Sequence, residues 1–171
     1  MRRGAATLAL ALLTACATVP RAGPTFAFPG AFAATQVVTV HAERGDQTLL
    51  ASVWREPGRF EVVFLDPALQ APLVSARLVG DAFVEERFVE FPMPASDVEA
   101  LLRDVSALYG SGDIRGSGDG TKVRVGRWEV VTSAPGGEAG CRFPERITWR
   151  LDGRTLPWIE VRTLDVRCDS R

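Results

Sequence analysis

Residues 96–110, SDVEALLRDVSALYG, carry the clearest helix pattern in this chain of 171 residues. Ser96 and Glu99 have the S-x-x-E spacing of a capping box, which predicts that the helix begins at Ser96. Gly110 supplies the signal for its end. Apolar residues recur at helical spacing along one stripe: Val98, Leu101, Leu102, Val105 and Leu108. An amphipathic helix of this kind covers apolar surface, so we expect it to lie on a sheet.

Strand patterns lie on both sides of this helix. The segment FEVVFL (60–65) is almost continuously apolar and predicts a strand that is buried on both faces. The apolar phase slips between Val161 and Leu164, which predicts a β-bulge or a strong twist. The pattern predicts about eight or nine strands, in the segments 36–42, 48–54, 60–65, 73–79, 82–91, 121–133, 146–151 and 156–166. Segment 121–133 is expected to be one strand or a bent pair around Gly126, and residues 110–120 are expected to form a flexible loop.

Antiparallel strands joined by short turns, with one inserted helix, predict an α+β fold. We expect a strongly curved antiparallel sheet, an incomplete β-barrel or half barrel, with the helix covering its concave side. Four tryptophans and nine phenylalanines are available to fill such a fold. Most of them are expected to be ordinary core residues. A concavity that they leave unfilled would be a lipid-sized apolar pocket.

The first residues have the features of an export signal. Arg2 and Arg3 precede an apolar run, residues 5–13, that is too short to span a bilayer. The sequence Leu13-Thr14-Ala15-Cys16 then has the form of the lipobox that ends a bacterial lipoprotein signal peptide. The alternative is an ordinary secretory signal that contains a cysteine. We predict that Cys16 is the first mature residue and carries a diacylglyceryl group and an amide-linked chain such as palmitate, which together suffice for stable anchoring.

The chain is accordingly expected to have three parts. These are a lipoprotein signal peptide (1–15), a lipidated N-terminus and tether (16–34), and a single half-barrel domain (35–171). The phenylalanines of the tether suggest that its later part docks on the domain. Ala17 and Thr18 lack the aspartate that retains some lipoproteins in the inner membrane, which favours the outer membrane, with the polypeptide facing the periplasm.

Two cysteines remain once Cys16 is assigned to lipid. Cys141 and Cys168 form an even pair in an exported and oxidising compartment, which predicts a disulfide between them. The alternative, a metal or redox pair, has no support in the sequence. There is no C-x-x-C motif, and His41 is the only histidine.

The sequence offers no catalytic constellation. His41 has no partner visible in the sequence, and neither a metalloprotease motif nor a nucleophile elbow is present. Glu85 and Glu86 are adjacent on a strand and therefore point to opposite faces. The chain has 20 basic and 21 acidic residues, so it lacks the excess of positive charge that is typical of nucleic-acid-binding proteins. We expect no enzyme activity, no cofactor and no metal.

Several short motifs resemble those of the outer-membrane lipoprotein receptors (LolB-like), which are related to a periplasmic lipoprotein carrier. They are Ser52-Val53-Trp54, Pro57-Gly58-Arg59-Phe60, Val62–Leu65, Asp66-Pro67-Ala68-Leu69, the helix 96–109, Pro144-Glu145-Arg146-Ile147, Asp152-Gly153-Arg154 and Ile159-Glu160-Val161. The chain is also similar to a set of uncharacterised bacterial lipoproteins, through Gln36-Val37-Val38 and Leu101-Leu102-Arg103-Asp104.

The resemblance implies two sites. A ligand-binding site for acyl chains would be lined by Trp54, Phe64, Val98, Leu101, Leu102 and Val105. A membrane-contact loop would contain Pro67, Ala68 and Leu69, although the family's loop leucine aligns with Ala68 and the leucine of this chain comes one residue later.

We expect a monomeric, membrane-anchored protein that accepts the acyl chains of lipoproteins. Its expected partners are these chains and a periplasmic carrier protein. The alternative is a non-catalytic accessory or scaffold lipoprotein that binds another envelope protein and fills its own interior. A continuous apolar cavity favours the first hypothesis and a packed interior favours the second. A hydrolase would require Ser or Asp side chains that converge on His41.

Overall fold

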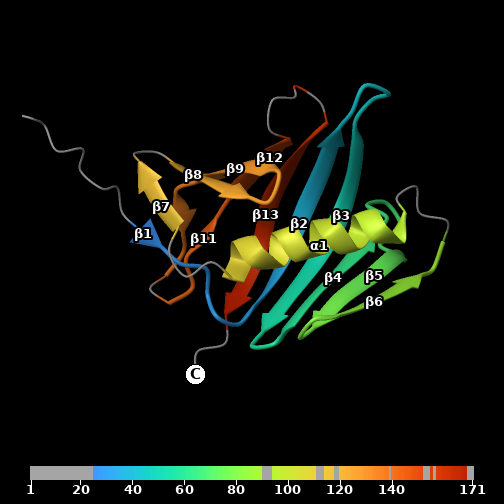
Figure 1. Ribbon diagram of the computed structural model, residues 1–171, viewed down its shortest axis with the longest axis horizontal. Helices are drawn as coiled ribbons and strands as arrows, with labels where there is room; N and C mark the ends of the chain where they lie inside the picture. The colour runs from blue at the N-terminus through green and yellow to red at the C-terminus, as the bar shows by residue number, and fades with distance from the viewer. Residues whose placement is uncertain are drawn as a thin grey trace, which may run out of the picture.

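The computed structural model describes residues 25–89, 94–110, 114–117, 120–138, 140–151, 155 and 157–168, and its side-chain detail omits 25–26, 114–117 and 120. An 11-stranded antiparallel sheet dominates the molecule, in the order β1-β7-β8-β9-β12-β13-β2-β3-β4-β5-β6 (Figure 1). The strands are β1 (Thr25–Phe26), β2 (Phe32–His41), β3 (Gln47–Glu56), β4 (Arg59–Leu65), β5 (Pro72–Val79), β6 (Ala82–Arg87), β7 (Ile114–Ser117), β8 (Gly120–Val125), β9 (Trp128–Ser133), β12 (Arg146–Leu151) and β13 (Trp158–Cys168). Two short strands, β10 (Pro135–Gly136) and β11 (Phe143–Pro144), pair separately.

The sheet is open. β1 and β6 form its edges, and no pairing among the described residues joins them. Helix α1 (Ala95–Gly110) runs across one face, where it contacts β5 and β8 (Figure 1). This face, which we call the inner face, carries buried side chains of the central strands, as the pair Val53 and Val62 illustrates. The expected α+β class and antiparallel, incomplete barrel are therefore in agreement with the structure.

The predicted bulge lies in β13. The register with β2 shifts between Thr163 and Asp165, so Leu164 has no partner in the ladder. The first half of β13 pairs with both β12 and β2, whereas the residues after the bulge pair with β2. A bulge bends a strand and re-aims its side chains, which explains why the apolar phase slips here.

The helix begins one residue before the predicted start. The carbonyl of Pro94 accepts N–H bonds from Asp97 and Val98, so α1 begins at Ala95, and Ser96 lies within its first turn. The predicted apolar stripe faces the sheet, with Val98, Leu102 and Leu108 buried.

Two consecutive helix residues hold α1 to opposite sides of the sheet. Arg103 donates a hydrogen bond to the carbonyl of Asp81 (2.9 Å), in the turn between β5 and β6. The Asp104 carboxylate packs against Gly126, in the turn between β8 and β9, so closely that a Cβ atom at Gly126 would lie 2.8 Å from its Oδ1. We call this pair of contacts the helix clasp.

Three expectations about local structure need correction. The FEVVFL strand, β4, is buried on one face, with Phe60 and Val62 inside and the other positions half-buried or exposed. Residues 114–117, expected in a flexible loop, form β7, because pairing with β1 and β8 overrides the local glycine content. The third concerns β6, which ends at Arg87 and is shorter than the predicted segment 82–91, whereas segment 121–133 is the bent pair around Gly126 that was one of its two predicted forms.

The later part of the tether segment packs into the domain, as its phenylalanines suggested. Phe28 and Phe32 are buried in the core, and β2 already begins at Phe32. Cys16, the signal peptide, Asp152-Gly153-Arg154 and the start of the last strand at residue 156 lie outside the described residues. Within the described part of the chain, no helix has the length and apolarity needed to cross a membrane.

Candidate functional site

The inner face of the sheet carries continuous cross-strand rows of apolar side chains. One row runs through Val40, Ile159, Trp149, Val130 and Val123, which are successive partners on β2, β13, β12, β9 and β8. The residues at the centre of this row are buried, whereas Val40 and Val123 at its ends are half-buried. The row therefore links a closed core to a more accessible apolar margin.

Side chains of the chain itself fill the space between α1 and the sheet. Phe28, Phe32, Tyr109 and Phe143 form an aromatic cluster with ring centroids 4.7 to 5.7 Å apart, several of them edge to face. All four residues are buried. The expected concavity is thus occupied by a packed core in this conformation.

One polar contact crosses this interior. Nε2 of Gln36 donates a hydrogen bond to the hydroxyl oxygen of Tyr109 at 3.1 Å, and both residues are buried. Burial raises the pKa of Tyr109 to about 12, and the hydrogen bond with Gln36 opposes this shift. No sequence pattern predicts this contact, because Gln36 and Tyr109 are 73 residues apart and come from separate elements.

The residues that the resemblance assigned to ligand binding have three different environments. Val98 and Leu102 are buried in the core, and Phe64, Leu101 and Val105 are partly buried against it. Trp54 does not join them. Since Val53 points inward and side chains alternate along a strand, Trp54 lies on the opposite face of the sheet and is 43% exposed.

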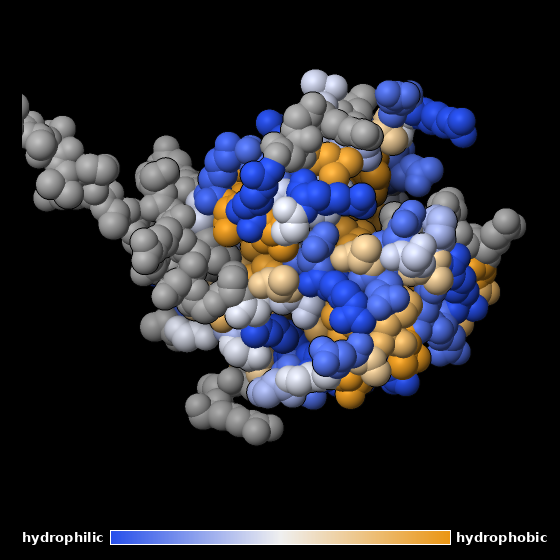
Figure 2. Space-filling model, viewed as in Figure 1, coloured by the Kyte–Doolittle hydropathy of each residue, from blue (hydrophilic) through white to orange (hydrophobic). Residues whose placement is uncertain are grey.

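A set of half-buried apolar residues remains accessible beside α1. We call it the inner stripe; its members come from β2, α1, β8 and β12 and are Val38, Val40, Leu101, Val105, Val123 and Leu151. Figure 2 shows hydrophobic surface next to the helix on this side, over the region where β9 and β12 lie in Figure 1. Leu101 and Val105 are the two predicted ligand residues that contribute to it.

The predicted membrane-contact loop is a rigid turn. Oδ1 of Asp66 accepts N–H bonds from Ala68 (2.8 Å) and Leu69 (2.7 Å), and Gln70 adopts a positive φ of 53°. Pro67 and Ala68 are exposed, and Leu69 at the tip is 80% exposed. The turn presents a leucine to solvent without depending on the core.

His41 has an acidic partner but no nucleophile. Its Nδ1 lies 2.9 Å from Oδ2 of Asp46, and its ring stacks on Trp158 with a centroid distance of 3.7 Å. Among the described residues, no serine or threonine hydroxyl contacts His41, and no group of His, Cys, Asp and Glu is suited to hold a metal. The pair instead secures the end of the β2–β3 hairpin.

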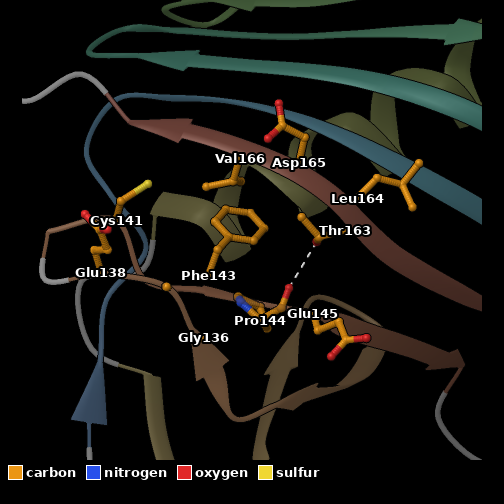
Figure 3. Close-up of a pocket in the computed structure, with 11 residues that line it drawn as sticks. Gly136, Glu138, Cys141, Phe143, Pro144, Glu145, Thr163, Leu164, Asp165 and Val166 are labelled. Carbon is orange, nitrogen blue, oxygen red and sulfur yellow. Dashed lines mark hydrogen bonds between the residues drawn. The ribbon is translucent and has the colours of Figure 1, made fainter.

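A second hollow lies beside the disulfide. Cys141 and Cys168 are bonded as predicted, with their Cα atoms 5.5 Å apart. Next to them is an open groove of about 450 Å³, lined by Gly136, Gly137, Glu138, Cys141, Phe143, Pro144, Glu145, Thr163, Leu164, Asp165 and Val166 (Figure 3). We call it the disulfide groove. The sequence pattern predicted the bulge in β13, which forms one wall of this groove, but it did not predict the groove itself.

Comparisons with known proteins find a likeness in structure. No protein-family model matches the chain, and no curated protein matches it. The fold is similar to the crystal structure of a LolA superfamily protein from Nitrosomonas europaea, with a TM-score of 0.46 and 10% sequence identity over 85% of this chain and 89% of that chain. The likeness concerns the arrangement of the backbone, and at this level it does not establish a shared function.

Proposed function

We propose that this chain is a non-enzymatic lipoprotein of the cell envelope that binds acyl chains, such as those of other lipoproteins, and assists their transfer to the outer membrane. The observation that carries this proposal is the inner stripe, an accessible apolar margin of the covered face beside α1. Each buried methylene group of an acyl chain contributes about 0.8 kcal/mol, so even a partly covered chain would be held without a cofactor.

Full entry of a chain requires α1 to move. The aromatic cluster fills the interior, so a long acyl chain can pass beneath the helix only if α1 shifts away from the sheet. The helix clasp holds it at two turns, through Arg103 on one side and Asp104 on the other. A ligand that binds the shifted form better would draw the protein towards it.

The proposed location rests on the N-terminal sequence. Lipid on Cys16 would tether the domain to the membrane, and Leu69 on its rigid turn would touch the bilayer during transfer. A periplasmic carrier protein is the expected donor, as in the family that the sequence motifs resemble.

Mass spectrometry of the protein purified from the envelope tests both parts of this proposal. We expect co-isolated acyl lipid and a mass on Cys16 that corresponds to diacylglyceryl and N-acyl groups. A delipidated sample should bind a fluorescent fatty acid. Failure to bind this probe, together with absence of lipid from the envelope sample, would contradict acyl binding, while an unmodified Cys16 would contradict the anchor alone.

A matched pair of variants locates the binding surface. Leu101→Glu places a carboxylate within the inner stripe, and Val131→Glu places one on the opposite face of the sheet, where Val131 is already exposed. Because an acyl chain cannot solvate a charge, we expect Leu101→Glu to weaken fatty-acid binding about tenfold or more, and Val131→Glu to leave it unchanged. Equal effects would exclude the inner stripe as the binding surface.

A second candidate is supported by the packed interior. If the core stays closed, the chain is a non-catalytic accessory lipoprotein that binds an envelope protein through its surface. In this case the delipidated protein should not bind the fatty acid, and Leu101→Glu should have no effect in cells.

A further inference from the structure

The disulfide groove is built as a rigid recess. At one end, the Cys141–Cys168 bond joins its two walls. At the other end, the Thr163 hydroxyl donates to the carbonyl of Pro144 (3.0 Å) and the Thr163 N–H donates to the carbonyl of Glu145 (2.8 Å). A ligand would therefore meet a preorganised surface and would not incur the cost of ordering it.

The floor and one wall of this groove are apolar. Phe143 and Pro144 are buried beneath it, and Val166 borders it. The bulge in β13 turns Leu164 outward at the rim, where it is 53% exposed. A bulge that re-aims a leucine towards solvent beside a groove provides an apolar contact for a partner.

The charges of the lining have one sign. Among the described residues, three carboxylates, Glu138, Glu145 and Asp165, line the groove, and no basic side chain does. Asp165 forms an ion pair with Arg167, whereas neither Glu138 nor Glu145 has an ion pair within the described part of the chain. Figure 3 shows these two glutamates on either side of Phe143 and Pro144. Arg142, which lies between Cys141 and Phe143 in the sequence, donates a hydrogen bond from its guanidinium to the carbonyl of Pro135.

We infer that the disulfide groove binds a short basic segment of a partner protein, with lysine or arginine side chains at Glu138 and Glu145 and an apolar side chain against Leu164. Its volume of about 450 Å³ suits a few residues of an extended chain. The same charges would repel the anionic head groups of a membrane surface, so a protein segment fits better than a bilayer. The inference is independent of acyl binding, because the groove contains no residue of the inner stripe.

Calorimetric titration of the full chain, in detergent, with an end-blocked peptide that alternates lysine and leucine tests this inference. The charge-reversed control peptide has glutamate in place of lysine. We expect the lysine peptide to bind, more weakly as salt is raised, and the glutamate peptide not to bind. Absence of binding by the lysine peptide, or equal binding by both, would overturn the inference.

Variants then assign the contact to the groove. The double variant Glu138→Gln/Glu145→Gln should weaken binding of the lysine peptide about tenfold. Its control, Glu43→Gln/Glu56→Gln, removes the same charge from exposed positions outside the groove. Leu164→Ser should also weaken binding, whereas Leu69→Ser should not. Equal losses in the test and control variants would contradict the assignment.

Discussion

The hydroxyl oxygen of Tyr109, in the last turn of α1, lies 3.1 Å from Nε2 of Gln36 at the middle of β2. The same amide nitrogen lies 3.4 Å from the hydroxyl of Thr163, next to the bulge in β13. Thr163 in turn contacts Pro144 at the disulfide groove. A chain of polar contacts thus runs from the covering helix through the core to the groove, and it fixes the end of α1 against the sheet.

The buried phenol predicts a loss of stability at alkaline pH. In the unfolded chain tyrosine has a pKa of about 10, and burial raises the pKa of Tyr109 to about 12. The folded state keeps its proton over this interval while the unfolded state loses it. The contribution to stability is therefore complete below pH 10 and falls as the pH rises towards 12, by about 3 kcal/mol at most.

Tyr109 is the only tyrosine, so its ultraviolet absorbance reports this ionisation alone. We expect the native protein to form tyrosinate near pH 12 and the denatured protein near pH 10. Urea unfolding at several pH values between 10 and 12 measures the accompanying loss of folding free energy. Tyr109→Phe should remove this pH dependence. A native titration midpoint near 10 would show that the ring is not buried as described.

The helix clasp predicts different costs for two glycine substitutions. Gly80 and Gly126 both adopt a positive φ, of 57° and 54°, in hairpin turns. A Cβ at Gly80 meets no atom within 4 Å, whereas one at Gly126 meets the Asp104 carboxylate. Gly80→Ala should lower the free energy of unfolding by about 1 kcal/mol through backbone strain, and Gly126→Ala by more.

Denaturant unfolding of both variants checks this difference. The double variant Gly126→Ala/Asp104→Ala should recover the stability that Gly126→Ala loses beyond the loss of Gly80→Ala. The second substitution removes the atoms with which the new methyl group collides. Identical losses for the two glycine variants would mean that α1 can move away from the β8–β9 turn at little cost.

Replacement of Asp104 by asparagine is expected to change stability by an amount that depends on pH. Partial burial raises its pKa above 3.8, while the indole N–H of Trp128 and the charge of Arg127 oppose this shift. The protonated form is thus favoured in the folded state, and stability is lost as the pH rises through the folded pKa. Asp104→Asn should therefore be more stable than the native chain at pH 7, by a margin that shrinks at acid pH.

Urea midpoints of both proteins, measured at several pH values between acid and neutral, give this margin. The opposite order, with Asn less stable at neutral pH, would mean that the contacts with Trp128 and Arg127 outweigh the burial of the charge.

The disulfide predicts a loss of stability on removal. It closes a loop with a sequence separation of 27, which in the chain-entropy model contributes about 3.5 kcal/mol. Cys141→Ser/Cys168→Ser should lose about this amount in chemical denaturation, and should also weaken peptide binding at the groove, since one wall is no longer tied. Unchanged stability would indicate that β11 is held by its other contacts alone.

Local patterns predicted most elements of the fold. Strands β3, β5 and β12 lie where the local patterns placed them, and the phase slip identified the bulge at Leu164. The orientation of Trp54 was also predictable from the sequence. Trp54 directly follows Val53, and adjacent residues of a strand point to opposite faces of the sheet. β7 gave no such signal, because its strand conformation depends on distant partners.

The sequence by itself determined most of the elements, the disulfide pairing and the amphipathic stripe of α1, because these depend on periodicity, turn residues and cysteine count. Only the tertiary structure decided that the concavity is filled, since Phe28, Phe32, Tyr109 and Phe143 come from separate segments and meet only after folding. It also decided the position of the helix clasp and of the disulfide groove. Contacts between distant segments follow from three-dimensional packing, and no local pattern in a single sequence records them.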